Sequence, residues 1–165
     1  TDTVLQSEMN TGTKMSFDIR FQHKPAEIKA PIETVKASQN LDHLRVLVAE
    51  DNQVNILVIK KTLERWGIVP TIAENGLKAL EKVEAHDFDV ILMDLHMPAM
   101  DGYETAVAVR NLKDAGKSSI PIIAFTATMD HNITKKVTEV GMNDYLPKPF
   151  KPEHLFDKLQ RLQTV

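Results

Sequence analysis

The chain contains 165 residues, of which 20 are Lys or Arg and 23 are Asp or Glu, giving a net charge of −3 at pH 7. This length suits one domain of ordinary size plus an appendage, and the charge gives no electrostatic reason to expect a nucleic-acid partner. The sequence has no cysteine, which excludes disulfides, thiolate metal sites and cysteine nucleophiles. No apolar run is long enough to span a bilayer, and the first residues lack the layout of a signal peptide.

The amino-terminal part of the chain differs in sequence pattern from the rest. Residues 15–21 alternate apolar and polar side chains, which predicts a half-buried strand, and residues 4–5 can begin a partner strand before the turn-forming residues 10–13. Because a hairpin of this size is marginal alone in water, a disordered tail is the alternative interpretation of residues 1–24. Residues 25–43 contain prolines and scattered charge without a sustained period, which indicates a linker.

From residue 44 onward, short apolar strands alternate with amphipathic helices. Strands are predicted at five places, over residues 44–49, 69–73, 88–93, 120–125 and 144–146. A helical pattern follows each strand, and residues 113–119 are predicted to form a loop between the third helix and the fourth strand. Five such repeats predict one parallel sheet with helices on both faces, a doubly wound α/β fold over residues 44–165.

The third predicted strand contains four consecutive apolar residues, 90–93, and stops abruptly at Asp94. This is the pattern of a central strand that is buried on both faces. Because parallel strands end at the same edge of their sheet, that edge collects the side chains of Glu50, Asp51, Asp94, Thr126 and Lys148. Three carboxylates in one cleft repel one another unless a cation lies between them, and their oxygen atoms suit Mg²⁺.

Such a cluster can take up a phosphoryl group. Asp94 can attack phosphorus as a nucleophile and form an acyl phosphate, while a bound metal, Lys148 and the Thr126 hydroxyl share the negative charge of the transferred oxygens. Each residue alone has an ordinary explanation, because Asp often caps a turn and a lysine is usually solvated. Their expected convergence on one edge favours the functional interpretation.

Residues 44–162 resemble the receiver domain of two-component response regulators. Four motifs carry this resemblance in order: the acidic pair within VAEDN at 48–52, the phosphoacceptor segment MDLHMPAMDG at 93–102, the pair Thr126–Ala127, and YLPKP at 145–149. The last motif matches a switch aromatic, a lysine and a proline that is usually preceded by a cis peptide bond. The stretch GMNDY at 141–145 is similar to receivers that are fused to hybrid sensor kinases.

The resemblance implies a flavodoxin-like receiver fold with five parallel strands in the order 2-1-3-4-5. It also implies a two-component phosphorelay, in which Asp94 takes a phosphoryl group from a phosphohistidine with the help of Mg²⁺. In this family pattern, Asp51 and Asp94 bind the metal directly together with the backbone carbonyl of His96. Glu50 then acts mainly through water.

The resemblance also implies roles for the residues around the metal. Thr126 and Lys148 hold the phosphoryl group, and Tyr145 moves inward as Thr126 does. His96 and Thr128 occupy the positions at which this family tunes hydrolysis of its own acyl phosphate, and we expect the His96 ring to be exposed. The face formed by the fourth helix, fifth strand and fifth helix then changes its affinity for a partner.

Residues 5–17 resemble the last strands of a histidine-kinase ATP-binding domain. The nucleotide-binding body of such a domain is absent, as is a phosphorylatable-histidine helix, since His43 and His154 have no matching context. We therefore expect a fragment of a hybrid histidine kinase that catalyses only the phosphorylation and dephosphorylation of its own Asp94. The implied partner is the phosphohistidine domain of a kinase or a histidine phosphotransfer protein. The expected location is the cytoplasm, without nucleic-acid or membrane contact by this segment, although the parent protein can be membrane-anchored.

Three other functions compete with this one. A magnesium-dependent phosphatase with an Asp nucleophile usually carries a second Asp two positions later, where this chain has His96. A flavodoxin-like nucleotide or FMN binder needs a hydroxyl- and Gly-rich loop after the first strand, where residues 50–52 would repel phosphate without a metal. A receiver-like module that binds partners without phosphorylation is expected to have lost one of the five site residues, and none is lost.

Overall fold

The computed structural model describes residues 3–8, 12–17, 40–127 and 131–162. The chain divides into two compact units, Thr1–Ala37 and Ser38–Val165. Within the described residues, no helix has the length and apolar character needed to cross a bilayer.

The first unit contains a hairpin. Strand β1 (Thr3–Glu8) pairs antiparallel with β2 (Gly12–Phe17), and the hydroxyl oxygens of Ser7 and Thr13 lie 2.9 Å apart across the pair. A hairpin is thus present in this region, but its second strand starts earlier than expected, because Gly12 and Thr13 belong to β2 and not to the turn. Residues 18–21 of the expected strand lie outside the described residues, as does the expected linker up to residue 39.

The second unit is built on a parallel sheet. Its strands are β3 (Val46–Ala49), β4 (Thr71–Ala73), β5 (Val90–Asp94), β6 (Ile122–Thr126) and β7 (Asp144–Pro147). They are arranged in the order β4-β3-β5-β6-β7, and all neighbouring pairs are parallel. This is the expected order 2-1-3-4-5. Every residue of β3, β5 and β6 is buried, because helices cover both faces of these strands.

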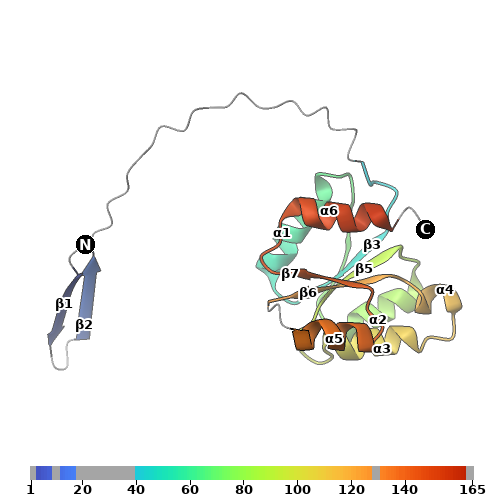
Figure 1. The fold of residues 1–165 in the computed structure, drawn as a ribbon. Coiled ribbons are helices and arrows are strands. Elements are labelled where there is room, and N and C mark those ends of the chain that lie inside the picture. Colours follow the sequence, from blue (N-terminus) through green and yellow to red (C-terminus); the bar gives the residue numbers. More distant parts are fainter. Residues whose placement is uncertain (1–2, 9–11, 18–39, 128–130, 163–165) are drawn as a thin grey trace. The chain divides into compact units, whose positions relative to one another are not determined.

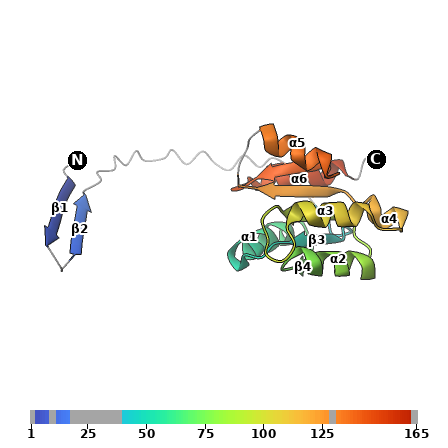
Figure 2. The same ribbon diagram turned by 90° about the horizontal axis from the view of Figure 1, so that it is seen from below.

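Helices lie on both sides of this sheet. They are α1 (Gln53–Glu64), α2 (Gly76–Ala85), α3 (Gly102–Arg110), α4 (Ala115–Ser118), α5 (His131–Glu139) and α6 (Pro152–Arg161). Figure 1 shows α1 and α6 on one face and α2, α3 and α5 on the other. In Figure 2, α1 and α2 lie near β3 and β4, away from α5 and α6. The expected loop over 113–119 contains the short α4. It is capped by Asp114, whose side chain accepts from the backbone amides of Gly116 and Lys117.

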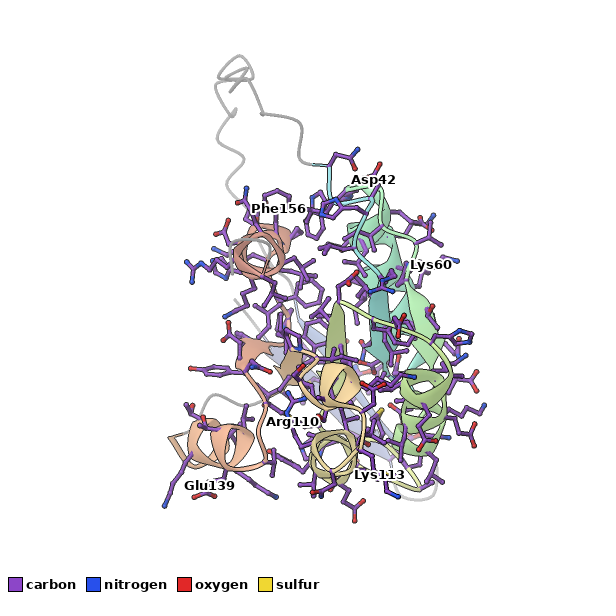
Figure 3. The ribbon with its side chains drawn as sticks, turned by 90° about the vertical axis from the view of Figure 1, so that its right-hand side faces the viewer. Asp42, Lys60, Arg110, Lys113, Glu139 and Phe156 are labelled. Atoms are coloured by element: carbon purple, nitrogen blue, oxygen red, sulfur yellow. The ribbon has the colours of Figure 1, made fainter. Side chains whose placement is uncertain are left out.

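Alternate residues of the strands supply two separate cores. Towards α2, α3 and α5 the sheet contributes Leu47, Ile91, Met93, Ile122 and Ala124. Towards α1 and α6 it contributes Val46, Val48, Val90, Leu92, Ile123 and Phe125. This second core includes Trp66 and Phe156, whose rings meet edge to face with centroids 5.3 Å apart. Phe156, on α6, is labelled in Figure 3.

The second unit begins earlier in the chain than residue 44, the start that the sequence pattern predicted. Leu41, within the expected linker, is 3% exposed and belongs to the core beneath α1 and α6. Its backbone amide donates to the Trp66 carbonyl over 2.8 Å. The chain from at least Leu41 onward therefore packs as part of the sheet domain.

Arg110, labelled in Figure 3, joins the end of α3 to two later segments, residues 118–120 and 141–143. Its guanidinium donates to the carbonyl oxygens of Gly141 and Ser118 over 2.8 Å and of Ile120 over 2.9 Å. It also donates to Asn143 Oδ1 over 2.9 Å. Burial lowers the pKa of this guanidinium, which nevertheless stays charged at neutral pH. The motif at 141–145 therefore has a structural role, in which it accepts hydrogen bonds from α3.

Asn143→Ala is expected to lower the free energy of unfolding by about 1–2 kcal/mol. The Asn143 Oδ1 atom accepts from Arg110 and from the Ile122 amide, each over 2.9 Å, so its removal leaves two donors without this acceptor. Urea denaturation measures the loss. Asn111→Ala, at an exposed residue at the end of α3, is the matched control, and an equal effect of both substitutions would contradict the prediction.

Candidate active site

Three carboxylates meet at the carboxyl edge of the sheet. Glu50 and Asp51 follow β3, and Asp94 ends β5. Each can offer one oxygen such that the three oxygens lie within 4.8 Å of one another. Glu50 is fully buried, Asp94 is 8% exposed and Asp51 is exposed. The structure thus brings together the acidic side chains that the sequence predicted to converge.

Lys148 neutralises part of the negative charge of this cluster. It follows β7, and its Nζ atom lies 2.6 Å from Glu50 Oε2 and 2.8 Å from Asp94 Oδ2. Its backbone amide donates to the Thr126 carbonyl over 2.6 Å, which ties the ends of β6 and β7 together beside the site. The Lys148–Pro149 peptide bond is cis, as the resemblance led us to expect.

The buried Glu50 carboxylate is also held from the other side, by the first turn of α1. Asn52 caps α1, since its side chain accepts from the amides of Val54 and Asn55. The Glu50 Oε1 atom accepts from the Asn55 side-chain amide over 2.9 Å and from the Asn52 backbone over 3.3 Å. Sequence reasoning missed Asn55. Its position one turn into α1, three residues after the cap, is a signal that could have indicated that it faces the strand end.

The loop after Asp94 wraps over the site in a fixed conformation. Asp94 Oδ1 accepts from the His96 amide over 3.3 Å, and the Gly102 amide donates to the Leu95 carbonyl over 3.1 Å. A Cβ atom at Gly102 would lie 2.2 Å from the Asp94 carbonyl oxygen, so only glycine fits there. Ala99 adopts a positive φ of 68° within the turn, a conformation that non-glycine residues seldom adopt.

Three of the remaining residues predicted from the sequence, Thr126, Tyr145 and His96, lie within the described part of the chain. Thr126 ends β6 and is 1% exposed, and Tyr145 lies half-buried on β7 beside Ala124 of β6. His96 is exposed, as expected for its ring. Thr128 lies outside the described residues. The switching and hydrolysis-tuning roles of these residues stay predictions.

The donor set of the acidic cluster fits Mg²⁺. All available ligand atoms are carboxylate oxygens, which this hard cation prefers, and it usually keeps several waters beside one or two carboxylates. Asp51 and Asp94 have accessible surface for such a site. Both Glu50 oxygens are already engaged by protein donors, so the water-mediated role expected for Glu50 stays a prediction.

Comparison with known proteins identifies the family. Residues 46–160 match the response regulator receiver domain. The chain is 38% identical over 128 residues to the hybrid signal transduction protein dokA of Dictyostelium discoideum, covering 78% of this chain and 7% of that protein. It is 31% identical over 156 residues to the autoinducer 2 sensor kinase/phosphatase LuxQ of Vibrio vulnificus (strain YJ016), covering 94% of this chain and 18% of that protein. The chain therefore spans only a small part of the length of these relatives.

Solved structures agree with this result. The receiver domain of a sensor histidine kinase from Pseudomonas aeruginosa PAO1, which holds a magnesium ion in its active-site cleft, matches with a TM-score of 0.68 and 36% identity, covering 74% of this chain and 98% of that chain. A Saccharomyces cerevisiae receiver domain, solved with a histidine phosphotransfer protein, matches with a TM-score of 0.67 and 28% identity, covering 72% of this chain and 88% of that chain. With its sheet order, acidic cluster and matched residues, the chain belongs to the response regulator receiver family, to which the receiver domains of hybrid histidine kinases also belong.

Proposed function

We propose that Asp94 is the phosphoryl acceptor of this receiver domain and that the domain acts as a switch in a phosphorelay. The observation that carries the proposal is the 2.8 Å contact between Lys148 Nζ and Asp94 Oδ2 within a cluster of three carboxylates. Glu50 cannot serve as the nucleophile, because it is fully buried and both of its oxygens are engaged. Asp94 retains accessible surface and lies beside a cation that can neutralise an incoming phosphoryl group.

The reaction proceeds by nucleophilic displacement at phosphorus. An Asp94 oxygen forms a bond to phosphorus as the P–N bond to the donor imidazole breaks, and the electron pair leaves with the imidazole nitrogen, which takes a proton. Lys148 stays near Glu50 and pairs with a phosphoryl oxygen, while the Thr126 hydroxyl donates to another. Mg²⁺, held by Asp51, Asp94 and the His96 carbonyl, would supply positive charge that lets anionic groups approach one another.

Phosphorylation of Asp94 then changes the packing around β6 and β7. A phosphoryl oxygen on Asp94 attracts the Thr126 hydroxyl, and Tyr145 follows into the space that Thr126 leaves. A modification shifts such an equilibrium only through the difference in its contacts with the two states. Water later attacks the acyl phosphate, at a rate that His96 and Thr128 tune.

The donor proposed for Asp94 is a phosphohistidine of a kinase or of a histidine phosphotransfer protein. A similar receiver domain was solved together with such a phosphotransfer protein. The parent proposed for the chain is a cytoplasmic or membrane-anchored hybrid histidine kinase, of which residues 1–24 are the end of the ATP-binding domain. The LuxQ alignment supports this origin, because it covers 94% of the chain and thus reaches upstream of the receiver at 46–160.

Intact-mass spectrometry after incubation with acetyl phosphate and Mg²⁺ tests the function. We expect one added phosphoryl group that disappears when EDTA is present, because the carboxylates repel the anionic donor without a divalent cation. Release of inorganic phosphate without an adduct would support the phosphatase alternative. An unmodified mass with no phosphate release would leave a receiver domain that binds partners without phosphorylation.

A further inference from the structure

The carboxylate of Glu50 is fixed by contacts on both of its oxygens. Oε1 accepts from the Asn55 side chain over 2.9 Å, and Oε2 accepts from Lys148 Nζ over 2.6 Å. Glu50 has no exposed surface, so water does not compete for these oxygens. The contacts form a line of side chains that runs from α1 through Glu50 to Lys148 and ends at Asp94 Oδ2, 2.8 Å further on.

These contacts fix the position of the Lys148 ammonium group. A carboxyl group turns readily about its terminal torsion, whose preferences are broad, and a lysine has a long flexible stem. With Oε1 held by Asn55, the second oxygen must point towards Lys148. Asn55 is not needed to cap α1 through its side chain, because the Asn52 side chain caps that helix. The Asn55 side-chain amide is therefore available to hold the Glu50 carboxylate by its hydrogen bond.

We propose that Asn55 is a positioning residue for phosphoryl transfer, which acts through Glu50 to keep Lys148 beside Asp94. The inference rests on the proposed function of Asp94 as the acceptor. Lys148 must leave Asp94 Oδ2 and pair with an incoming phosphoryl oxygen without drifting out of the site. A Glu50 carboxylate that is held by α1 keeps Lys148 within the site during this movement. Asn55 is only partly buried, so a substitution there is compatible with the fold.

The test compares Asn55→Leu with the unsubstituted chain and with Gln53→Leu, which removes an exposed amide from the same first turn of α1. Initial phosphorylation rates are measured with acetyl phosphate at saturating Mg²⁺, and Mg²⁺ affinity is measured by calorimetry. We expect Asn55→Leu to lower the rate roughly 10-fold or more, as for loss of one hydrogen bond to a charged group. Mg²⁺ affinity should change less than about threefold, because the resemblance implies that Glu50 acts on the metal mainly through water and not as a direct ligand. Gln53→Leu should leave both values unchanged.

A double-mutant cycle separates positioning from a general structural effect. In a Glu50→Gln background, Asn55→Leu should have little further effect on the rate, because the group through which Asn55 acts has already been changed. Asn55→Gln keeps an amide donor and should recover part of the rate. Equal losses in both backgrounds would overturn the proposal, as would a fall of Mg²⁺ affinity in step with the rate or an unchanged rate in Asn55→Leu.

A measurement without any phosphoryl donor keeps this inference distinct from the proposed function. The side-chain methylene signal of Lys148, identified by its absence in Lys148→Arg, is followed by carbon NMR of lysine-labelled protein. We expect Asn55→Leu to shift this signal and Gln53→Leu to leave it in place. If the unsubstituted chain takes no phosphoryl group but the shift occurs, the acceptor function is wrong and the positioning contact stands. An unshifted signal overturns the positioning role.

Discussion

Asp94→Asn is expected to abolish phosphoryl uptake, reducing the rate by about 10³-fold or more, as is common when a nucleophile is removed. The amide keeps the size of the side chain but lacks the anionic oxygen that attacks phosphorus. Asp94 lies at the end of the buried strand β5. Lys148 Nζ, 2.8 Å away, can neutralise the negative charge of a phosphoryl group that is transferred to this carboxylate. Intact-mass spectrometry with acetyl phosphate and Mg²⁺ measures the loss.

Asp87→Asn is the matched control for this experiment. Asp87 precedes β5, at the opposite end of the strand from Asp94, and its partner there is Arg45 at 3.5 Å. Phosphorylation of this variant should equal that of the unsubstituted chain. An adduct of full size on Asp94→Asn would assign the nucleophile to another residue of the acidic cluster and contradict the proposed function.

Lys148→Met is expected to lower the free energy of unfolding by about 3 kcal/mol in EDTA, because breaking a buried ion pair leaves an uncompensated charge. Lys148 Nζ contacts Glu50, which has no exposed surface, and Asp94, which has little. Mg²⁺ should restore part of the lost stability, because a ligand that binds only the native state stabilises that state. The substitution also removes the positive charge of Lys148 from the acidic cluster, which favours binding of Mg²⁺ there. Urea denaturation with and without Mg²⁺ measures both effects.

Lys158→Met provides a control with nearly the same exposure of the lysine. The side chain of Lys148 is 19% exposed and that of Lys158 is 20% exposed, but the partner of Lys158 is Asp144, whose side chain is 39% exposed. Water can solvate Asp144 after the substitution, so we expect a loss of only about 0–1 kcal/mol without dependence on Mg²⁺. Equal losses in the two variants, or a larger Lys148→Met loss when Mg²⁺ is added, would contradict this explanation.

The architecture was predictable because its cause lies in local patterns. Four apolar residues before Asp94 and similar runs elsewhere predict buried parallel strands, and these strands are present. Their order across the sheet came from the resemblance to a family, since periodicity does not say which strands are neighbours. The short α4 was missed because one Asp114 cap on four residues leaves no periodic signal. Leu41 was missed because one apolar residue does not reveal the core that it joins.

The charged centre of the site was predictable for a related reason, since parallel strands bring their ends together. The sequence therefore indicated Glu50, Asp94 and Lys148, which the structure places in contact. It did not indicate the side-chain network around them. Asn55 contacts Glu50 through a helix turn, and Arg110 contacts carbonyls from segments up to 31 residues away. Such contacts depend on how the elements pack, which composition and spacing do not specify.

The central claim is that the phosphoryl group forms an acyl phosphate on Asp94, and chemical trapping tests it most directly. The chain is treated with acetyl phosphate and Mg²⁺ and then with borohydride, which reduces an aspartyl phosphate to homoserine, and its peptides are sequenced by mass spectrometry. We predict homoserine at position 94 alone, and none when EDTA is present during phosphorylation. Homoserine at another aspartate, or a phosphorylated chain that resists reduction at position 94, would contradict the account.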